Sequence, residues 1–213
     1  MDFGFGLPWG SDEAIFGVKG WREMIRQIGK EYAAAGTARA MAHTINALPK
    51  FKGHGPYRFN EGRTDYRFYL DHGIAYYRLT ELAAPQAISQ WHLGSGSTVG
   101  FSTITGLSAL DYLIALRESG KLNFSVWPFE PIDPDGHVLV ESYPAICPTC
   151  ANNSQVRGKD ERDAWKVLQC LVKATESSEI GKWFDVLSRP FGRIENVDFT
   201  KQIRFEGSIF GLR

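Results

Sequence analysis

A carboxylate at the end of an apolar strand is the feature that most constrains how this chain can fold. Glu141 follows the apolar run 138–140 and precedes Ser142, Tyr143 and Pro144. An ionised carboxylate is costly to bury unless a cation or a proton accompanies it. The fold must therefore give Glu141 a metal ion, an arginine or the end of a helix.

Two further aspartates occupy comparable places. Asp2 opens a short predicted strand, and Asp163 opens an apolar helical run, with Asp160 shortly before it. If the three segments converge, Asp2, Glu141 and Asp163 would bind Mg2+ or Mn2+, hard cations that prefer oxygen ligands, with Asp160 as a further candidate. Simpler roles are also open: Asp2 can fix a turn, Asp163 can favour a first helical turn, and Asp160 can be an N-cap.

The length and the charge of the chain narrow its class. A chain of 213 residues fits one large domain with a substantial core, or two small ones. Lys plus Arg and Asp plus Glu number 24 each, so no overall basic charge drives non-specific duplex binding, and any nucleic-acid contact must be local. No stretch approaches the roughly 20 apolar residues of a membrane helix, and no signal peptide is recognisable. We therefore expect a cytoplasmic protein.

Hydrophobic periodicity and turn residues predict alternating helices and strands. Strands are expected at residues 2–8, 124–129 and 137–141, with a turn at 133–136 between the last two. Helices are expected at residues 12–35, 37–48, 108–119 and about 178–188. A further helix begins at Asp160 or Arg162, and its apolar side comprises Ala164, Val167, Leu168, Leu171 and Val172.

Residues 51–81 interleave aromatic and basic side chains without a clean period, which predicts a long functional loop with short strands. Its rings offer faces on which single-stranded bases stack, worth about 1–3 kcal/mol per base. The candidates for phosphate contacts are Arg58, Arg63, Arg67 and Arg78. The alternative is an ordinary hairpin with inward aromatic rings and solvated arginines.

Other motifs carry weaker signals. Cys147 and Cys150 have the spacing of half a zinc site, but no second pair with matching spacing follows. The glycine-rich segment 94–100 lacks the lysine of a phosphate loop and predicts a backbone turn. No Gly-x-Ser-x-Gly elbow occurs, which argues against hydrolases of that kind.

Six segments, spread over almost the whole chain, carry a resemblance. They are residues 1–8, 97–100 with Gly106, 126–130, 141–144, 163–167 and 206–212. In this order they resemble an uncharacterised family of predicted nucleases with a ribonuclease H-like fold, related to the Holliday-junction resolvases.

The resemblance implies a single α/β domain, a mixed sheet flanked by helices, with an inserted segment at about residues 50–120. It also implies that Asp2, Glu141 and Asp163 hold the metal ions. Family members begin with a three-stranded meander that carries an early aspartate, and this sequence has no room for it. We expect either a truncated amino terminus, a partner or second copy that supplies those strands, or a site that works without that ligand.

These observations lead to three functional hypotheses. The first is metal-dependent hydrolysis of nucleic-acid phosphodiester bonds, in which two ions stabilise the entering and leaving oxygens. The second is a binding or scaffolding module of the same fold without catalysis, which forms a stable complex with a partner or a homo-oligomer. The third is a phosphotransferase on a related actin-like scaffold, although no pair of glycine-rich nucleotide-binding segments supports it.

Overall fold

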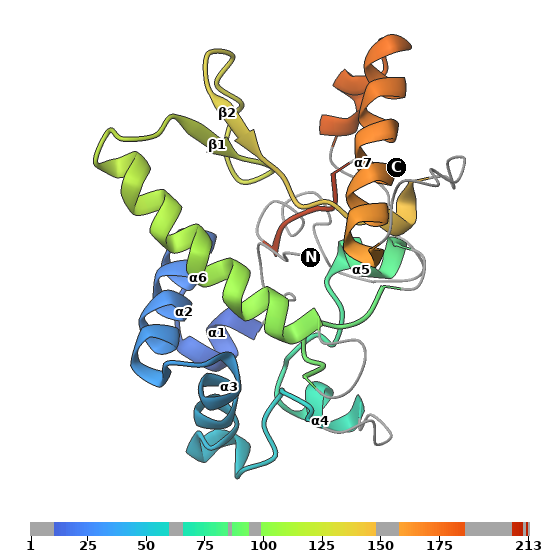
Figure 1. Ribbon diagram of the computed structural model, residues 1–213. Coiled ribbons are helices and arrows are strands. Elements are labelled where there is room, and N and C mark those ends of the chain that lie inside the picture. Colours follow the sequence, from blue (N-terminus) through green and yellow to red (C-terminus); the bar gives the residue numbers. More distant parts are fainter. Residues whose placement is uncertain are drawn as a thin grey trace.

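The computed structural model describes residues 11–59, 66–84, 87–93, 99–147, 158–185, 206–210 and 212. Within these ranges the protein is a helix-rich α/β structure with a small parallel sheet (Figure 1). In chain order its elements are α1 (Ser11–Phe16), α2 (Trp21–Ala35), α3 (Ala38–Asn46), η1 (Pro49–Phe51), α4 (Tyr66–Asp71), α5 (Leu79–Ala83), α6 (Val99–Glu118), β1 (Phe124–Val126), β2 (His137–Leu139), η2 (Pro144–Ile146), α7 (Lys159–Glu176) and η3 (Ile180–Phe184).

The predicted helix at 12–35 is wrong, because two helices occupy this stretch. α1 ends at Phe16 and α2 begins at Trp21. The break contains Gly17 and Gly20, whose φ angles of 69° and 107° lie outside the helical region and suit glycine alone without strain. The next helix was predicted correctly, since α3 lies within residues 37–48 and Thr37 caps it.

The main core lies between α6 and the helices α2 and α3, which run along one side of it (Figure 1). Gly29 permits the close approach of α2 and α6, because an added Cβ would lie 2.4 Å from Oδ2 of Asp111. Ile25, Met41 and Leu107 are completely buried there. Removing this apolar surface from water is the main force that holds the helices together.

α6 is longer than the predicted helix at 108–119, because it already begins at Val99. Its 20 residues are long and apolar enough to cross a membrane by length and composition, so the expectation that no stretch approaches this limit is wrong. A buried core helix passes the same test, and α6 packs on α2. This one helix is therefore weak support for a membrane span.

The two predicted strands after α6 are present but short. β1 and β2 pair in parallel, with Phe124 opposite His137 and Val126 opposite Leu139. The predicted turn between them is confirmed by the hydrogen bond from the Gly136 amide to the Asp133 carbonyl, at 3.2 Å. Two residues after β2, Glu141 forms an isolated parallel bridge with Ile209. Within the described ranges the coarse α/β class holds, with fewer strands than expected.

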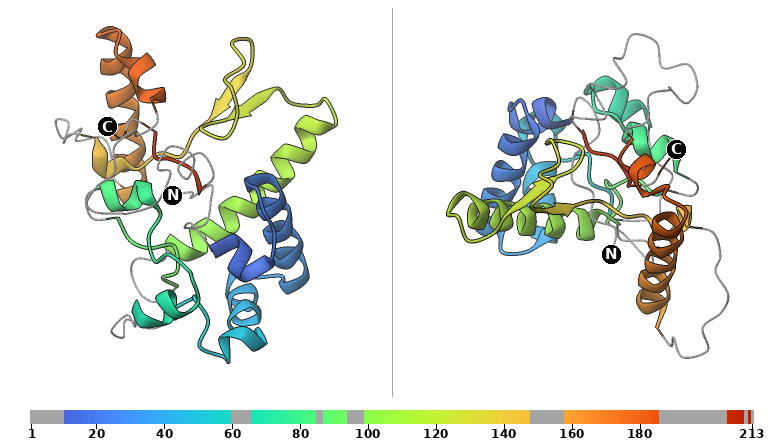
Figure 2. Two further views of the ribbon diagram at one scale, coloured as in Figure 1. Left: turned by 180° about the vertical axis from the view of Figure 1, so that it is seen from behind. Right: turned by 90° about the horizontal axis from the view of Figure 1, so that it is seen from above.

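α7 begins at Lys159, close to the predicted start, and its apolar side is only partly covered. Leu168 and Val172 are 50% and 47% exposed, whereas Cys170 and Ala174 are buried. The helix contacts η2 and η3, and Figure 2 shows it across the molecule from α2 and α3. Its N-cap is Gly158, so Asp160 does not cap it.

The segment at 51–81 differs from the predicted loop with strands. It forms the short helices α4 and α5, and its strand-like pairing is limited, in the described ranges, to a bridge between Arg58 and His92. At the far end of the chain, η3 is a 3-10 helix within the range predicted for a helix at 178–188. The predicted strand at 2–8 and most of the glycine-rich turn at 94–100 lie outside the described residues.

A second, smaller core lies apart from the main one. It is built from Leu79 and Ala84 of the α5 region and from Ile209 and Leu212 near the carboxyl terminus. The amide of Ile209 donates to Oγ1 of Thr80 at 3.0 Å, and the amide of Phe210 donates to the carbonyl of Glu141 at 2.8 Å. Segments far apart in sequence therefore meet around α5.

Candidate functional site

Four charged side chains are enclosed in the smaller core, and together we call them the Arg78 cluster: Arg78, Glu81, Glu141 and Glu206. Arg78 stands immediately before α5, and its amide donates to Oε2 of Glu81 at 2.9 Å. Its Nη1 donates to Oε2 of Glu141 at 2.7 Å, and its Nη2 donates to the other oxygen at 2.5 Å. The pairing of Arg78 with Glu141 is thus bidentate, the geometry that suits a guanidinium and a carboxylate best.

The remaining polar groups of the Arg78 cluster complete a closed network. Nε of Arg78 donates to Oε1 of Glu81 at 3.0 Å, and Oε1 of Glu206 accepts from the Leu79 amide at 2.5 Å. The side chains of Arg78 and Glu141 are only 3% and 4% exposed. The adjoining cavity of about 30 Å3 has room for a water molecule but not for a nucleotide. The cluster is therefore built as a structural support.

The electrostatics of the Arg78 cluster follow from one guanidinium facing several carboxylates. Burial acts to lower the pKa of Arg78, but the carboxylates of Glu141 and Glu81 outweigh it and raise the pKa above its ordinary value. Burial raises the pKa of Glu81 above its ordinary value, against the lowering effect of Arg78. Glu81 thus holds its proton more tightly than an exposed glutamate does.

Among the readings left open for Glu141, the pairing with an arginine is confirmed. The candidate metal ligands do not come together as one group where they are described. Asp160 and Asp163 line a cavity of about 350 Å3 with Ser142 and Pro144, and Glu141 does not line it. Asp163 lies 3.5 Å from Nζ of Lys166.

Within the described residues, no group of three or more His, Cys, Asp or Glu side chains is placed to hold a metal ion. The predicted ligand Asp2 and the predicted phosphate contact Arg63 lie outside these residues, as does Cys150. Cys147 is buried. The described carboxylates therefore do not fit a Mg2+ or Mn2+ site.

The other predicted arginines divide between two places. Arg78 is enclosed in its cluster, whereas Arg58 and Arg67 line a basic pocket beside α4, with a volume of about 360 Å3. The members of the basic pocket are Lys50, Phe51, Lys52, His54, Arg58, Arg67, Phe68, Asp71 and His72. The pocket lies between the end of η1, the isolated β-bridge at Arg58 and one side of α4.

Arg58 is held firmly in the wall of the basic pocket. Its amide donates to the Trp91 carbonyl at 2.8 Å, and its carbonyl accepts from the Leu93 amide at 2.7 Å. Its guanidinium carbon lies 5.3 Å from the ring centre of Phe68 and 5.6 Å from that of Tyr69. Nε of Arg58 is buried and has no hydrogen-bond partner among the described groups.

Two other basic side chains of the pocket, Lys50 and His72, contact backbone carbonyls. Nζ of Lys50 donates to the carbonyls of Ala14 and Ile15, and burial lowers its pKa. The two ring nitrogens of His72 lie 2.8 Å from the Phe68 carbonyl and 3.1 Å from the Lys50 carbonyl. These contacts hold both side chains in place at the basic pocket.

Sequence reasoning missed Glu81 and Glu206 in the Arg78 cluster and Lys50, Lys52, His54 and His72 in the basic pocket. The spacing of Arg78 and Glu81 is that of one helical turn, a signal that could have paired them. No local signal links Glu206 to α5, because the contact spans 127 residues. The basic residues of η1 meet Arg58 only through tertiary structure.

Comparison with known protein families, with curated proteins and with solved structures finds no match to this chain. The resemblance to predicted nucleases with a ribonuclease H-like fold therefore stays a prediction. Any functional conclusion depends on the geometry of the two charged regions.

Proposed function

We propose that this protein binds the phosphodiester backbone of nucleic acid through the basic pocket beside α4. The observation that carries the proposal is the convergence of four basic side chains, Lys50, Lys52, Arg58 and Arg67, with a single carboxylate, Asp71. This charge is local, because the whole chain has a formal net charge of zero. A concave site of one sign focuses its field and raises the local concentration of anions.

Two kinds of anionic ligand could occupy the basic pocket, a phosphate or a carboxylate-rich protein surface. The chemistry of the pocket suits the phosphate better. Guanidinium groups present several donors in a plane and bind phosphate oxygens through two hydrogen bonds. The Phe51 and Phe68 rings form part of the same lining. Both rings are buried, so they support the basic side chains rather than stack on bases. The proposed class is therefore a binding module, the second of the three hypotheses.

The test is the affinity for a labelled oligonucleotide, measured by fluorescence anisotropy. Lys52 and Arg67 are exposed, so reversing both charges in Lys52→Glu/Arg67→Glu should leave the fold intact. We expect affinity to fall at least about tenfold, since each reversed charge near a phosphate changes the interaction by about 1–2 kcal/mol in water.

The matched control is Lys121→Glu/Lys182→Glu, which changes the net charge equally. Lys121 follows the end of α6 that lies far from α4, and Lys182 is in η3 (Figure 1). The proposal is lost if both double variants weaken binding to the same extent, because the effect would then reflect overall charge.

The second candidate is the metal-dependent nuclease of ribonuclease H-like fold. It is favoured by one observation: the residues after Glu141 and the first turns of α7 line one cavity, with Asp160 and Asp163. The described carboxylates do not fit a metal site as they stand, so we derive no catalytic step for it.

Asp163→Asn tests this candidate better than Glu141→Gln, because Asp163 is 29% exposed and its replacement leaves the buried ion pair of Glu141 intact. If the protein is a nuclease, it should cleave single-stranded, duplex, hybrid or branched substrates in the presence of Mg2+ or Mn2+. Asp163→Asn should abolish this cleavage. Absence of cleavage by the wild-type protein on all four substrates would remove this candidate.

A further inference from the structure

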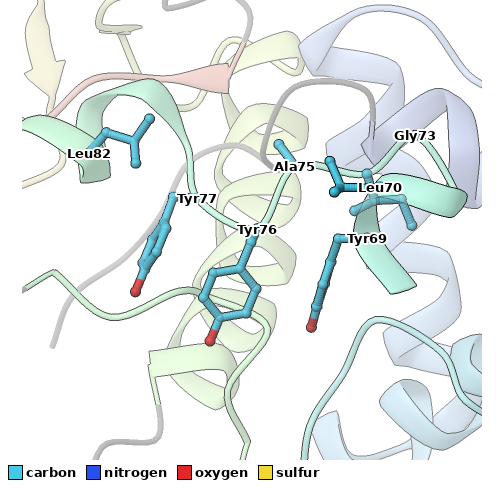
Figure 3. Close-up of a pocket in the computed structure, with 8 residues that line it drawn as sticks. Tyr69, Leu70, Gly73, Ala75, Tyr76, Tyr77 and Leu82 are labelled. Carbon is cyan, nitrogen blue, oxygen red and sulfur yellow. The ribbon is translucent and has the colours of Figure 1, made fainter. Parts of the chain in front are cut away.

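An apolar pocket lies on the other side of α4 from the basic pocket. Its cavity of about 380 Å3 is lined by Tyr69, Leu70, Gly73, Ile74, Ala75, Tyr76, Tyr77 and Leu82, and we call it the tyrosine pocket. Figure 3 shows the rings of Tyr69, Tyr76 and Tyr77 side by side, with their hydroxyl oxygens on the same side. This volume falls in the lower part of the range of about 300–1,000 Å3 that is typical of small-molecule sites.

The helical spacing of α4 explains why the two pockets are neighbours. Arg67, Phe68, Asp71 and His72 face the basic pocket, whereas Tyr69, Leu70 and Gly73 face the tyrosine pocket. Side chains three and four positions apart share a side of a helix. A helix with its side chains is about 10–12 Å wide, so a strand of a few nucleotides spans both pockets.

We propose that the tyrosine pocket receives an unpaired nucleobase of a strand whose phosphates lie in the basic pocket. This inference rests on the proposed function and makes it more specific: the ligand is single-stranded nucleic acid. A duplex keeps its bases paired and stacked inside, so it offers the basic pocket its phosphates but offers the tyrosine pocket nothing. Base stacking on aromatic rings tolerates any sequence, because every base has a π face.

The walls of the tyrosine pocket are fixed before any ligand arrives. The hydroxyl of Tyr69 donates to the Pro56 carbonyl at 2.7 Å, and the Ile74 amide donates to the Tyr69 carbonyl at 2.8 Å. Nε1 of Trp91 donates to the Ala75 carbonyl at 2.9 Å. A site already in its bound shape loses less conformational freedom on binding.

Two exposed leucines that line the tyrosine pocket also support a bound ligand. Leu70 is 80% exposed and Leu82 is 46% exposed, and both line the pocket. Apolar side chains gathered at a concave site, beside a cluster of cations, complement a ligand that is apolar at one end and anionic at the other. A nucleotide unit has this character, since its flat base and its phosphate are joined by one sugar.

The experiment compares two strands with two variants of Tyr77, which is partly exposed. The probes are an oligothymidine and an oligonucleotide of the same length that carries abasic sites, so that only the first supplies bases. Tyr77→Ala removes the ring, and Tyr77→Phe is the matched control that keeps it. Thermal unfolding of both variants checks that they fold like the wild type.

We expect the wild type to bind the oligothymidine about tenfold more tightly than the abasic strand. Tyr77→Ala should lose this tenfold preference and keep the affinity for the abasic strand, whereas Tyr77→Phe should keep the preference. A matched duplex should bind the wild type no better than the abasic strand does.

The outcomes separate this inference from the proposed function. If the wild type binds both strands equally and Tyr77→Ala changes nothing, the phosphate site stands and the base site is overturned. If the wild type binds no strand, the proposed function itself fails. If a molecule without phosphate, such as the free thymine base, binds as tightly as the oligothymidine, the link between the pockets is refuted.

Discussion

The basic pocket and the Arg78 cluster both contain arginines from the same aromatic and basic stretch, yet their surroundings give those arginines opposite roles. Arg78 is 3% exposed and pairs with carboxylates on both sides of its guanidinium. Arg58 lines an open pocket and packs on two rings. A buried cation needs its charge compensated by the protein, whereas a cation at an open pocket is available to a ligand.

Removing the guanidinium of the Arg78 cluster should have the largest effect of all. Arg78→Met leaves Glu81, Glu141 and Glu206 buried without their cation, and we expect a loss of about 3–5 kcal/mol in the free energy of unfolding. Urea denaturation followed by circular dichroism measures it. The control is Arg162→Met, an exposed position on α7, which should change stability by less than about 0.5 kcal/mol. Equal stability of the two variants would contradict a structural role for Arg78.

Removing one carboxylate of the same cluster should have a smaller effect. Glu141→Gln keeps the shape of the side chain and loses the charge, while Arg78 retains Glu81, so we expect a loss of about 2 kcal/mol. Oligonucleotide affinity at a temperature where the variant is folded should not change. If Glu141→Gln abolished binding or cleavage and left the free energy of unfolding unaltered, the Arg78 cluster would be functional and not structural.

Arg58→Met tests the corresponding change in the basic pocket. The methionine can keep part of the apolar packing on Phe68 and Tyr69, but the cation is lost. We expect oligonucleotide affinity to fall about tenfold and stability to fall by less than about 1 kcal/mol, the reverse of the pattern at Arg78. Anisotropy titration and urea denaturation of one preparation measure both quantities. A large loss of stability with unchanged affinity would make Arg58 a second structural arginine.

Salt should weaken ligand binding at the basic pocket and leave the Arg78 cluster unaffected. If about three phosphates contact the basic pocket, raising the salt from about 50 to about 200 mM should weaken binding of a single strand about tenfold. Buried ion pairs are screened much less than exposed charges. The urea midpoint of the wild type should therefore stay nearly constant over the same salt range. An affinity that does not respond to salt would argue against phosphate contacts.

The smallest expected effect is a dependence of stability on pH that arises from Glu81. Because burial raises the pKa of Glu81 in the folded protein, its contribution is full below the ordinary pKa of glutamate and is lost as the pH rises through the raised value. Glu81→Gln cannot titrate, so its stability should fall less steeply than that of the wild type over this window. Parallel pH profiles for the two proteins would show that Glu81 carries no such linkage.

Local patterns in the sequence predicted several elements correctly because they depend on near neighbours. α3 has its threonine N-cap, the start of α7 lies where the polar run gives way to an apolar period, and the turn at 133–136 follows from its proline and glycine. The predictions that failed depend on contacts between segments far apart in the sequence. The apolar side of α7 is only partly covered, because tertiary contacts decide which side of a helix is buried and apolar residues alone do not.

The candidate site was predicted only in part for the same reason. The need of Glu141 for a compensating partner was evident from its place after an apolar run, and Arg58 and Arg67 were recognised as candidates for phosphate contacts. That the partner of Glu141 is Arg78, 63 residues away, was not predictable from spacing. Arg78 was assigned to nucleic acid because its neighbours in sequence resemble those of Arg58.

The sequence by itself therefore determined the local elements, the charge balance and the kinds of side chain available for chemistry. Tertiary structure alone decided which arginine is enclosed and which is open, and which carboxylates share one guanidinium. The physical reason is that the energy of a charge depends on its distance from other charges and from water. Those distances are set by contacts between segments that lie far apart along the chain.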